Sequence, residues 1–344
     1  MFDKIVIVTR QTRLEETIRK FNTKGQAKFY ITNRGQSFED YELEYDNYAR
    51  AKEAVVQSFE PGVKFHLIDR SYLPNYMFGP NDLVLTLGQD GLVVNTAKYL
   101  NGQPIFAVNP DPARFDGVLM PFQTDQLSKN LGKVLNQSYD LHKITMAEVK
   151  LGDNQSLYAF NDFFIGPKSQ SSARYTINFN KNSERQISSG IIVSTPAGST
   201  GWFSSVFNMA NGINAYSNSE IKCELRDIAW EERILLFAVR EPFASKWSGA
   251  SLVAGTIQEG MELVLESHMP ENGVIFSDGM ESDYLDFSSG TTAKIQLAQK
   301  TTNLIASFDK IKPIQDLEEM ETSEKKTNTN KMKEKIDLNT KSKR

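Results

Sequence analysis

The order of apolar segments near the start of the chain is the feature that most constrains its fold. Short apolar runs alternate with segments of helical character, and no two-residue hairpin turn joins the runs. Strands that alternate with helices pair in parallel, because each connection has to cross over the sheet. The apolar runs lie at residues 5–8, 64–68, 83–87 and 105–108. The helical segments lie at residues 12–21, 46–59 and 92–101, and residues 22–45 are expected to be irregular. We predict an α/β domain over residues 1–145.

The pattern changes after a mainly helical stretch at residues 121–145. Short strands separated by Gly, Asn, Ser or Pro then follow, with one helix near residues 200–211. The strands are expected at residues 148–160, 173–179, 187–194, 233–239, 262–265, 273–277 and 292–297. We predict a β-rich domain over residues 146–300, with residues 301–314 returning to pack on the two domains. Residues 315–344 have almost no large apolar side chains, which is typical of a disordered charged tail.

Composition limits the compartment and the partners. The formal net charge of -4 gives no overall attraction to nucleic acid or to anionic membranes, so neither is expected as a partner. Cys223 is the single cysteine, which excludes an internal disulfide framework and a cysteine-rich zinc site. A reducing cytoplasm fits this composition best. No apolar stretch approaches the ~20 residues of a membrane span.

An acidic motif follows the third apolar run. Residues 83–87 lead into Gly88-Gln89-Asp90-Gly91 and then into a helix. The free N–H groups of a helix start favour anions, and glycines let phosphates approach the backbone closely. Asp90 could accept a proton from an attacking hydroxyl or hold a magnesium ion. An ordinary Asp-Gly turn between two buried elements explains these four residues equally well.

A second turn of small residues starts the helix near residue 200. Residues 195–200, Thr-Pro-Ala-Gly-Ser-Thr, offer hydroxyls and backbone N–H groups that suit a ribose, an amide or a phosphate. A capped helix start is the simpler alternative. A hydrolase with Ser199 as nucleophile and His268 as base is a third, but the surrounding β-rich sequence and the missing oxyanion segment argue against it.

Other motifs are informative only in combination. Asn161-Asp162 and Ser277-Asp278-Gly279 each follow an apolar strand, and alone each could be a simple turn. The chain has no P-loop, no protein-kinase catalytic loop and no G-x-G-x-x-G after its first strand. Any phosphate chemistry must therefore use another scheme.

Taken in chain order, the four motifs resemble the signature of NAD kinases, over roughly residues 3–310. Residues 108–117, 188–190 and 239–242 resemble the mitochondrial-type branch and its bacterial relatives. The resemblance implies an N-terminal α/β nucleotide-binding domain of the NAD kinase and diacylglycerol kinase type, followed by a β-sandwich-like domain. The site would lie in the cleft between them.

The resemblance also implies roles for individual residues. Asp90 would be the catalytic residue, as proton acceptor or as organiser of the metal, and a magnesium ion would be held mainly through ATP, since no direct metal motif is present. ATP and its phosphates would contact Gly88, Gln89, Gly91, Asn109 and Arg114. NAD would contact Asn161, Asp162, Thr195, Pro196, Gly198, Ser199, Thr200 and Asp278. A homodimer or larger homo-oligomer is implied as well.

Three positions depart from the family pattern. Gln89 replaces the second glycine of Gly-Gly-Asp-Gly, Asp162 replaces a glutamate, and Ser189 replaces an aspartate. If position 89 needed a positive φ, glutamine would cost about 1 kcal/mol in strain. The leading hypothesis is transfer of the ATP γ-phosphoryl group to the adenosine ribose 2'-hydroxyl of NAD, which yields NADP. The alternatives are a non-catalytic NAD or NADP sensor and a related diacylglycerol-type lipid or sugar kinase.

Overall fold

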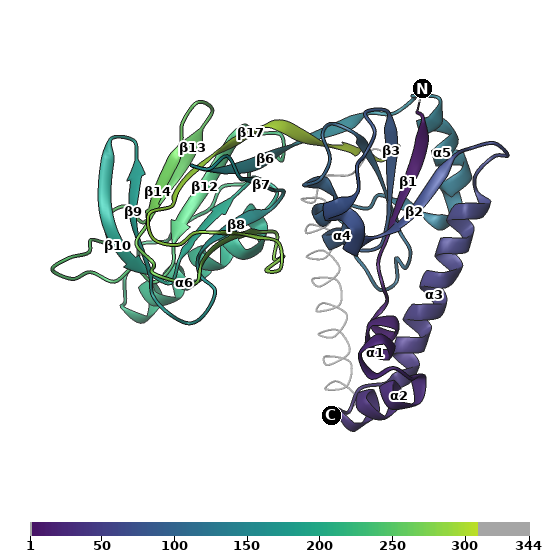
Figure 1. The fold of residues 1–344 in the computed structure, drawn as a ribbon, viewed down its shortest axis with the longest axis horizontal. Coiled ribbons are helices and arrows are strands. Elements are labelled where there is room, and N and C mark those ends of the chain that lie inside the picture. Colours follow the sequence, from purple (N-terminus) through teal and green to yellow (C-terminus); the bar gives the residue numbers. More distant parts are fainter. Residues whose placement is uncertain (1, 309–344) are drawn as a thin grey trace, which may run out of the picture. The chain divides into compact units, whose positions relative to one another are not determined.

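The computed structural model describes residues 2–308, and it contains two β-sheets flanked by helices (Figure 1). The N-terminal half of the larger sheet is parallel, in the order β4-β3-β1-β2, with a short β5 beside β4. These strands are β1 (Lys4–Thr9), β2 (Phe65–Asp69), β3 (Asp82–Leu87), β4 (Pro104–Asn109) and β5 (Phe122–Gln123). The predicted parallel sheet with crossover helices is therefore confirmed.

The helices of this half are α1 (Arg13–Phe21), α2 (Lys24–Asn33), α3 (Phe38–Gln57), α4 (Asp90–Ala97) and α5 (Leu127–Leu135). Thr12 caps α1 with a capping box, since its hydroxyl accepts from Glu15 N and Glu15 Oε2 accepts from Thr12 N. The prediction that residues 22–45 are irregular is wrong. The hydroxyls of Thr23 and Ser37 cap α2 and the early start of α3, and α2 buries only Ala27 and Ile31, which leaves a weak apolar pattern.

The C-terminal half consists mainly of antiparallel strands in two sheets. The larger sheet continues through β6 (Leu141–Leu151), β7 (Ser156–Ala159), β9 (Ala173–Phe179), β10 (Asn182–Ser188), β14 (Leu263–Ser267) and β17 (Thr292–Ile305). The smaller sheet has the order β13-β12-β11-β8-β15-β16. Its strands are β8 (Asp162–Pro167), β11 (Ile191–Ser194), β12 (Ile234–Val239), β13 (Ala254–Gln258), β15 (Gly273–Ser277) and β16 (Tyr284–Asp286).

The two sheets of the C-terminal half share one apolar core. Phe163 and Phe237 of the smaller sheet and Tyr175 and Ile295 of the larger sheet are all fully buried in it. One helix, α6 (Ser204–Tyr216), follows a short helical turn at Ser199–Phe203. The two-sheet packing agrees with the β-sandwich-like domain expected from the sequence.

Two long strands join the halves. β17 pairs with β6 and β14 in antiparallel fashion and with β4 in parallel, so the large sheet is continuous. The prediction that residues 121–145 are mainly helical is wrong at its end, because Leu141 begins β6 and pairs with the distant Ile305. β6 and β17 also cross the domain boundaries predicted near residues 145 and 300, which stay predictions.

All of these elements belong to one unit, Met1–Ala306. Residues 309–314 of the predicted returning segment and the predicted tail at residues 315–344 lie outside the described residues. Among the described helices, none has the length and apolar character needed to cross a bilayer.

Candidate active site

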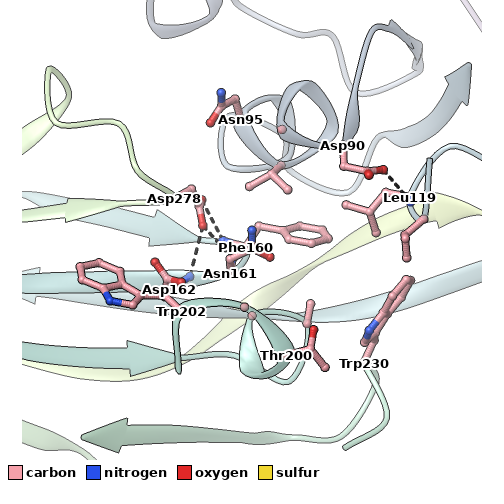
Figure 2. A pocket seen from close by; sticks show the side chains of 16 residues that line it. Asp90, Asn95, Leu119, Phe160, Asn161, Asp162, Thr200, Trp202, Trp230 and Asp278 are labelled. Carbon is pink, nitrogen blue, oxygen red and sulfur yellow. Dashed lines mark hydrogen bonds between the residues drawn. The ribbon is translucent and has the colours of Figure 1, made fainter. Parts of the chain in front are cut away.

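A cavity of about 390 Å³ lies within this unit, lined by residues of both halves (Figure 2). The N-terminal half contributes the start and one face of α4 and the segment just before β5. The C-terminal half contributes the turn between β7 and β8, the turn after β11, Trp230 and the end of β15. The lining side chains that Figure 2 labels are Asp90, Asn95, Leu119, Phe160, Asn161, Asp162, Thr200, Trp202, Trp230 and Asp278.

Asp90 is the first residue of α4 and faces this cavity. Gly88 allows the sharp approach of the chain to α4, because a Cβ there would lie 2.7 Å from Leu92 Cδ2. Asp90 Oδ1 accepts a hydrogen bond from Leu119 N at 2.8 Å. The carboxylate makes no other hydrogen bond or ion pair with a described residue, so its second oxygen is left for chemistry.

The residues beside Asp90 leave the helix start open. Gln89 has φ -117°, so its backbone is extended and the strain considered from the sequence is absent. Its exposed side chain makes no capping hydrogen bond to α4. Gly91 lines the cavity, and a Cβ there would meet no atom within 4 Å. Leu92 N donates to Gln89 O, whereas the N–H groups of Asp90 and Gly91 remain accessible to an anion.

Asn109 and Arg114 do not line the cavity. Asn109 is buried and ties the following loop, since its Nδ2 donates to Phe115 O and its Oδ1 accepts from Asp111 N. Arg114 pairs with Asp40 of α3 at 2.6 Å, and the Arg114 and Arg13 guanidinium groups lower the pKa of Asp40 to about 2. Both residues shape the loop that leads to Leu119, and their contact with ATP stays a prediction.

Asp278 fastens the turn that carries Asn161 and Asp162. Its Oδ1 accepts from Asn161 N at 2.7 Å and from Asp162 N at 3.3 Å, and its Oδ2 accepts from Phe160 N at 3.1 Å (Figure 2). Asp278 itself has a positive φ of 55°. Burial raises the pKa of this carboxyl to about 6, although the three N–H groups act in the opposite direction.

Asp162 presents a carboxylate without a donor to the same cavity. It is 9% exposed, and its side chain makes no hydrogen bond or ion pair with any described residue. Burial, together with the nearby charge of Asp278, raises the pKa of Asp162 to about 7. A ligand that brings a donor or a positive charge would favour the ionised form of this group.

The turn after β11 is pressed against the β7–β8 turn. A Cβ on Gly198 would lie 2.1 Å from Asn161 O, so only glycine fits there. The Thr195 hydroxyl donates to Phe160 O and accepts from Gly198 N, and the Ser199 hydroxyl donates to Pro196 O. These hydroxyls are used inside the protein.

Only some of the residues predicted to bind NAD line the cavity. Asn161, Asp162, Gly198, Thr200 and Asp278 line the cavity. The remaining three are buried behind its wall, and their role in ligand binding stays a prediction. They are Thr195, Pro196 and Ser199.

The hydrolase alternative lacks its catalytic pair. Ser199 Oγ donates to Pro196 O at 2.7 Å, whereas His268 Nε2 lies 2.8 Å from Thr176 Oγ1. Both groups are therefore held by other partners, and the nucleophile–base contact that such an enzyme requires does not form.

A polar cluster holds the other end of α4 against β15 and the turn after it. Lys98 Nζ lies 3.0 Å from Asp283 Oδ2 and 3.0 Å from Ser277 Oγ, and its side chain is 2% exposed. Lys300 Nζ donates to the carbonyls of Lys98 and Leu100, each at 2.8 Å. Burial lowers the pKa of Lys300 to about 8. These bonds fix α4, and with it Asp90, relative to Asp278.

No family model matches the chain. The individual proteins to which the chain is similar are named NAD kinase or NADH kinase. The chain is 24% identical to a probable NADH kinase of Oryza sativa over 222 residues, which cover 58% of this chain and 63% of the relative. It is 30% identical to an NAD kinase of Cytophaga hutchinsonii over 132 residues, covering 36% and 44%. These matches support the NAD kinase family. The matched segments span about two fifths to two thirds of the length of these curated relatives.

Solved structures of NAD and NADH kinases share the fold. Yeast NADH kinase complexed with NADH gives a TM-score of 0.54 at 16% identity, covering 89% of this chain and 84% of that one. An Archaeoglobus fulgidus NAD kinase in complex with ATP gives 0.51 at 13% identity, covering 88% and 94%. The two-domain NAD kinase fold expected from the sequence is therefore confirmed. The mitochondrial-type branch stays a prediction.

The structure shows residues at the cavity that the sequence motifs did not predict. Trp202 directly follows the 195–200 turn, is 38% exposed and forms part of the cavity wall. Leu119 supplies the N–H group that holds Asp90, and its backbone role leaves no mark in the sequence. Asn95 lies four residues after Gly91, so helical spacing alone would have placed it on the same face.

Proposed function

We propose that this chain is an NAD(H) kinase that transfers the γ-phosphoryl group of ATP to the 2'-hydroxyl of the adenosine ribose. The observation that carries the proposal is the Asp90 carboxylate at the start of α4, held by Leu119 N–H through one oxygen and facing the cavity with the other. The relatives named NAD kinase and NADH kinase support the same activity.

In the proposed reaction, Asp90 orients the acceptor and takes its proton. The 2'-oxygen attacks the γ-phosphorus, the bond from that phosphorus to the β,γ-bridging oxygen breaks, and ADP leaves with the bond's electron pair. The 2'-hydroxyl proton passes to the free oxygen of Asp90. The open N–H groups around Gly91 would balance negative charge on the phosphates. Gly88 and Gln89 would line the donor path, where Gln89 extends into solvent.

A magnesium ion fits this site only when the donor brings most of its ligands. No group of three or more His, Cys, Asp or Glu side chains among residues 2–308 could hold a metal ion. Asp90 offers one free carboxylate oxygen, and Mg²⁺ commonly binds through one or two carboxylates plus substrate phosphates and waters. When bound, the ion would neutralise charge on the transferring phosphoryl group.

The C-terminal wall would recognise the dinucleotide. Asn161, Asp162 and Thr200 place an amide, a carboxylate and a hydroxyl on the cavity surface, and the Trp202 indole offers a flat apolar face. Such a mixture suits a ligand that carries sugar hydroxyls and planar rings. Asp278, Thr195, Pro196 and Ser199 would act by holding these groups in place.

Self-association is a further part of the proposal. No residue of α6 is buried, and Met209, Ile213 and Tyr216 are 44%, 57% and 89% exposed. Apolar side chains grouped on one exposed helix are typical of a surface that a second copy covers. Light scattering should therefore report a dimer or larger assembly, and Ile213→Glu should shift it toward the monomer. A cytoplasmic location is proposed from the single cysteine alone.

The test is a coupled assay of the purified full chain with ATP, magnesium and either NAD or NADH, followed by an NADP-specific dehydrogenase. Steady formation of NADP or NADPH supports the proposal. Tight NAD binding without turnover, with ATP or with polyphosphate, would instead identify the sensor. Phosphorylation of diacylglycerol or a sugar, with NAD left unchanged, would identify the lipid or sugar kinase alternative.

A further inference from the structure

The two ends of the larger sheet differ in whether their outer edges are covered. At one end, residues 243–249 run along the outer edge of β10. Phe243 N donates to Ile187 O at 2.8 Å. Gly249 N donates to Arg185 O at 3.0 Å. At the other end, β2 pairs with β1 on one side and with no described strand on the other (Figure 1). The outer edge of β2 is therefore open in the described chain.

The register shows which backbone groups of β2 face outward. Ile5 N donates to Lys64 O, so the parallel ladder with β1 uses alternate residues of this segment, among them His66. The N–H and C=O groups of Phe65 and Leu67 point away from β1 and bond to no described residue. These two donors and two acceptors are the groups that a further strand would engage.

The side chains of β2 are apolar and exposed on one face. Phe65 and Leu67 lie two residues apart, so they share a face of the strand, and they are 38% and 47% exposed. Residues 65–69 contain no proline, lysine or β-bulge, which are the features that commonly keep an exposed edge from pairing. An edge with free backbone groups and exposed apolar side chains is typical of a surface that another strand covers.

A second copy of β2 fits this edge in one antiparallel register. A two-fold axis at His66 places Phe65 of each copy opposite Leu67 of the partner subunit. This register allows four backbone hydrogen bonds and two apolar side-chain contacts. Lys64 then lies opposite the partner's Ile68, and no two lysine or arginine side chains are opposed. A symmetric dimer needs a self-complementary surface of this kind.

The register with its axis at Leu67 is poorer. It would place Phe65 opposite the partner's Asp69, so an aromatic ring would meet a carboxylate. It would also place Lys64 opposite the partner's Arg70, and like charges directly opposite each other are destabilising. The charges and apolar side chains around β2 therefore favour the axis at His66.

We propose that β2 is a self-association surface, on which an antiparallel pair of β2 strands centred on His66 joins the larger sheets of two copies. The surface is separate from α6, and the inference does not rest on the proposed function. An extended segment of a different protein is the alternative occupant, and the experiment distinguishes the two.

Disulfide trapping in the purified full chain tests the register. Cys223 is first replaced in Cys223→Ser, since it is the single cysteine. His66→Cys then places two thiols opposite each other with Cα atoms about 4.5 Å apart, which suits a disulfide. Under mild oxidation with copper phenanthroline, most of this variant should run as a linked dimer on a non-reducing gel. Lys64→Cys is the matched control and should stay unlinked, because its own copy would lie four residues along the strand, about 13 Å away.

Sedimentation equilibrium tests the side-chain contacts without a new cysteine. Leu67→Lys removes two apolar contacts from each pair of strands, so association at this surface should weaken at least about tenfold. Leu43→Lys makes the same change at a leucine of α3 that is 53% exposed, and it should associate as the wild-type chain does.

Two results would overturn the inference. One is that His66→Cys links no more than Lys64→Cys, which is also the result expected if a different protein occupies the edge. The other is that Leu67→Lys has the same association constant as the wild-type chain. If His66→Cys does not fold, amide hydrogen exchange of residues 64–69 in the wild-type chain replaces the trapping. This exchange should slow as protein concentration rises, and a rate independent of concentration would refute the pairing.

Discussion

The two walls of the cavity are built in different ways. The α4 wall carries Asp90, whose carboxylate accepts one backbone hydrogen bond, and Gly91, whose surroundings are open. The opposite wall is two turns in direct backbone contact at Gly198 and Asn161, fastened by the buried carboxylate of Asp278. The first wall leaves a reactive carboxylate oxygen free, whereas in the second wall Asp278 and the Thr195 and Ser199 hydroxyls hold the two turns in place.

This contrast indicates that the two halves have different roles in the proposed reaction, one in proton transfer and the other in recognition. Proton transfer needs a group with an unengaged oxygen, and Asp90 has one. Recognition needs fixed positions, and the three N–H groups bound by Asp278 fix the Asn161-Asp162 turn. Substitution of Asp90 should therefore change turnover, whereas substitutions in the turns held by Asp278 should change binding and stability.

The largest effect is expected from Asp90→Asn. The amide cannot take the 2'-hydroxyl proton, so kcat should fall by roughly 10²–10⁴. The dissociation constant for NAD should change by less than about threefold, since recognition is assigned to Asn161, Asp162 and Thr200 and not to Asp90. Initial rates and calorimetry on the same preparation measure both quantities. Activity near the wild-type level would remove Asp90 from its proposed role.

Gly198→Ala tests the backbone contact of the opposite wall. The new Cβ would lie 2.1 Å from Asn161 O, so the two turns must move apart. We expect a loss of about 3 kcal/mol in stability, measured by chemical denaturation, together with weaker NAD binding. Gly132→Ala, inside α5, is the control, because a Cβ there meets no atom within 4 Å. Equal stability of the two variants would show that the contact is dispensable.

Asp162→Asn tests the buried carboxylate through pH. Because the folded-state pKa of Asp162 is about 7, against 3.8 ordinarily, the native state binds more protons between these values. This group therefore makes the wild-type chain less stable as pH rises from about 4 to about 7, with no further change above. The variant should gain on the order of 2 kcal/mol relative to wild type between pH 5 and pH 8. Denaturation curves that shift in parallel at both pH values would contradict the assignment.

Gln89→Gly should have the smallest effect. The extended backbone at position 89 accepts a side chain, and Gln89 makes no capping bond, so restoring Gly-Gly-Asp-Gly removes little. We expect at most a threefold change in the KM for ATP and a stability change below about 1 kcal/mol. A large gain in activity would mean that the glutamine blocks the donor and that the wild-type chain is closer to a sensor.

The sequence predicted the parts of the fold that depend on local pattern. The parallel strands could be predicted because each is a short apolar run between helices. The capping box at Thr12 predicted the start of α1. The prediction failed at α2, which has only two buried side chains. It failed again at residue 141, because the first residues of β6, 141–145, pair with β17 more than 150 residues away.

The candidate site, like the fold, could be predicted from the sequence only in part. Asp90, Asn161, Asp162, Gly198 and Thr200 were named from motifs and line one cavity. A sequence motif does not show which partner a side chain contacts. The motifs could therefore not show that the Thr195 and Ser199 hydroxyls donate to backbone carbonyls of the protein, or that Arg114 pairs with Asp40. Such choices depend on tertiary neighbours that a single sequence does not display.

The most direct test is ³¹P NMR of the products formed by the purified chain from ATP, magnesium and NAD. The account predicts a new phosphomonoester resonance that matches the 2'-phosphate of NADP, with one ADP formed for each phosphoryl group transferred. It also predicts that Asp90→Asn, which still binds NAD, forms this resonance roughly 10²–10⁴ times more slowly. Inorganic phosphate alone, a phosphate ester elsewhere on the dinucleotide, or an unchanged yield from Asp90→Asn would contradict it.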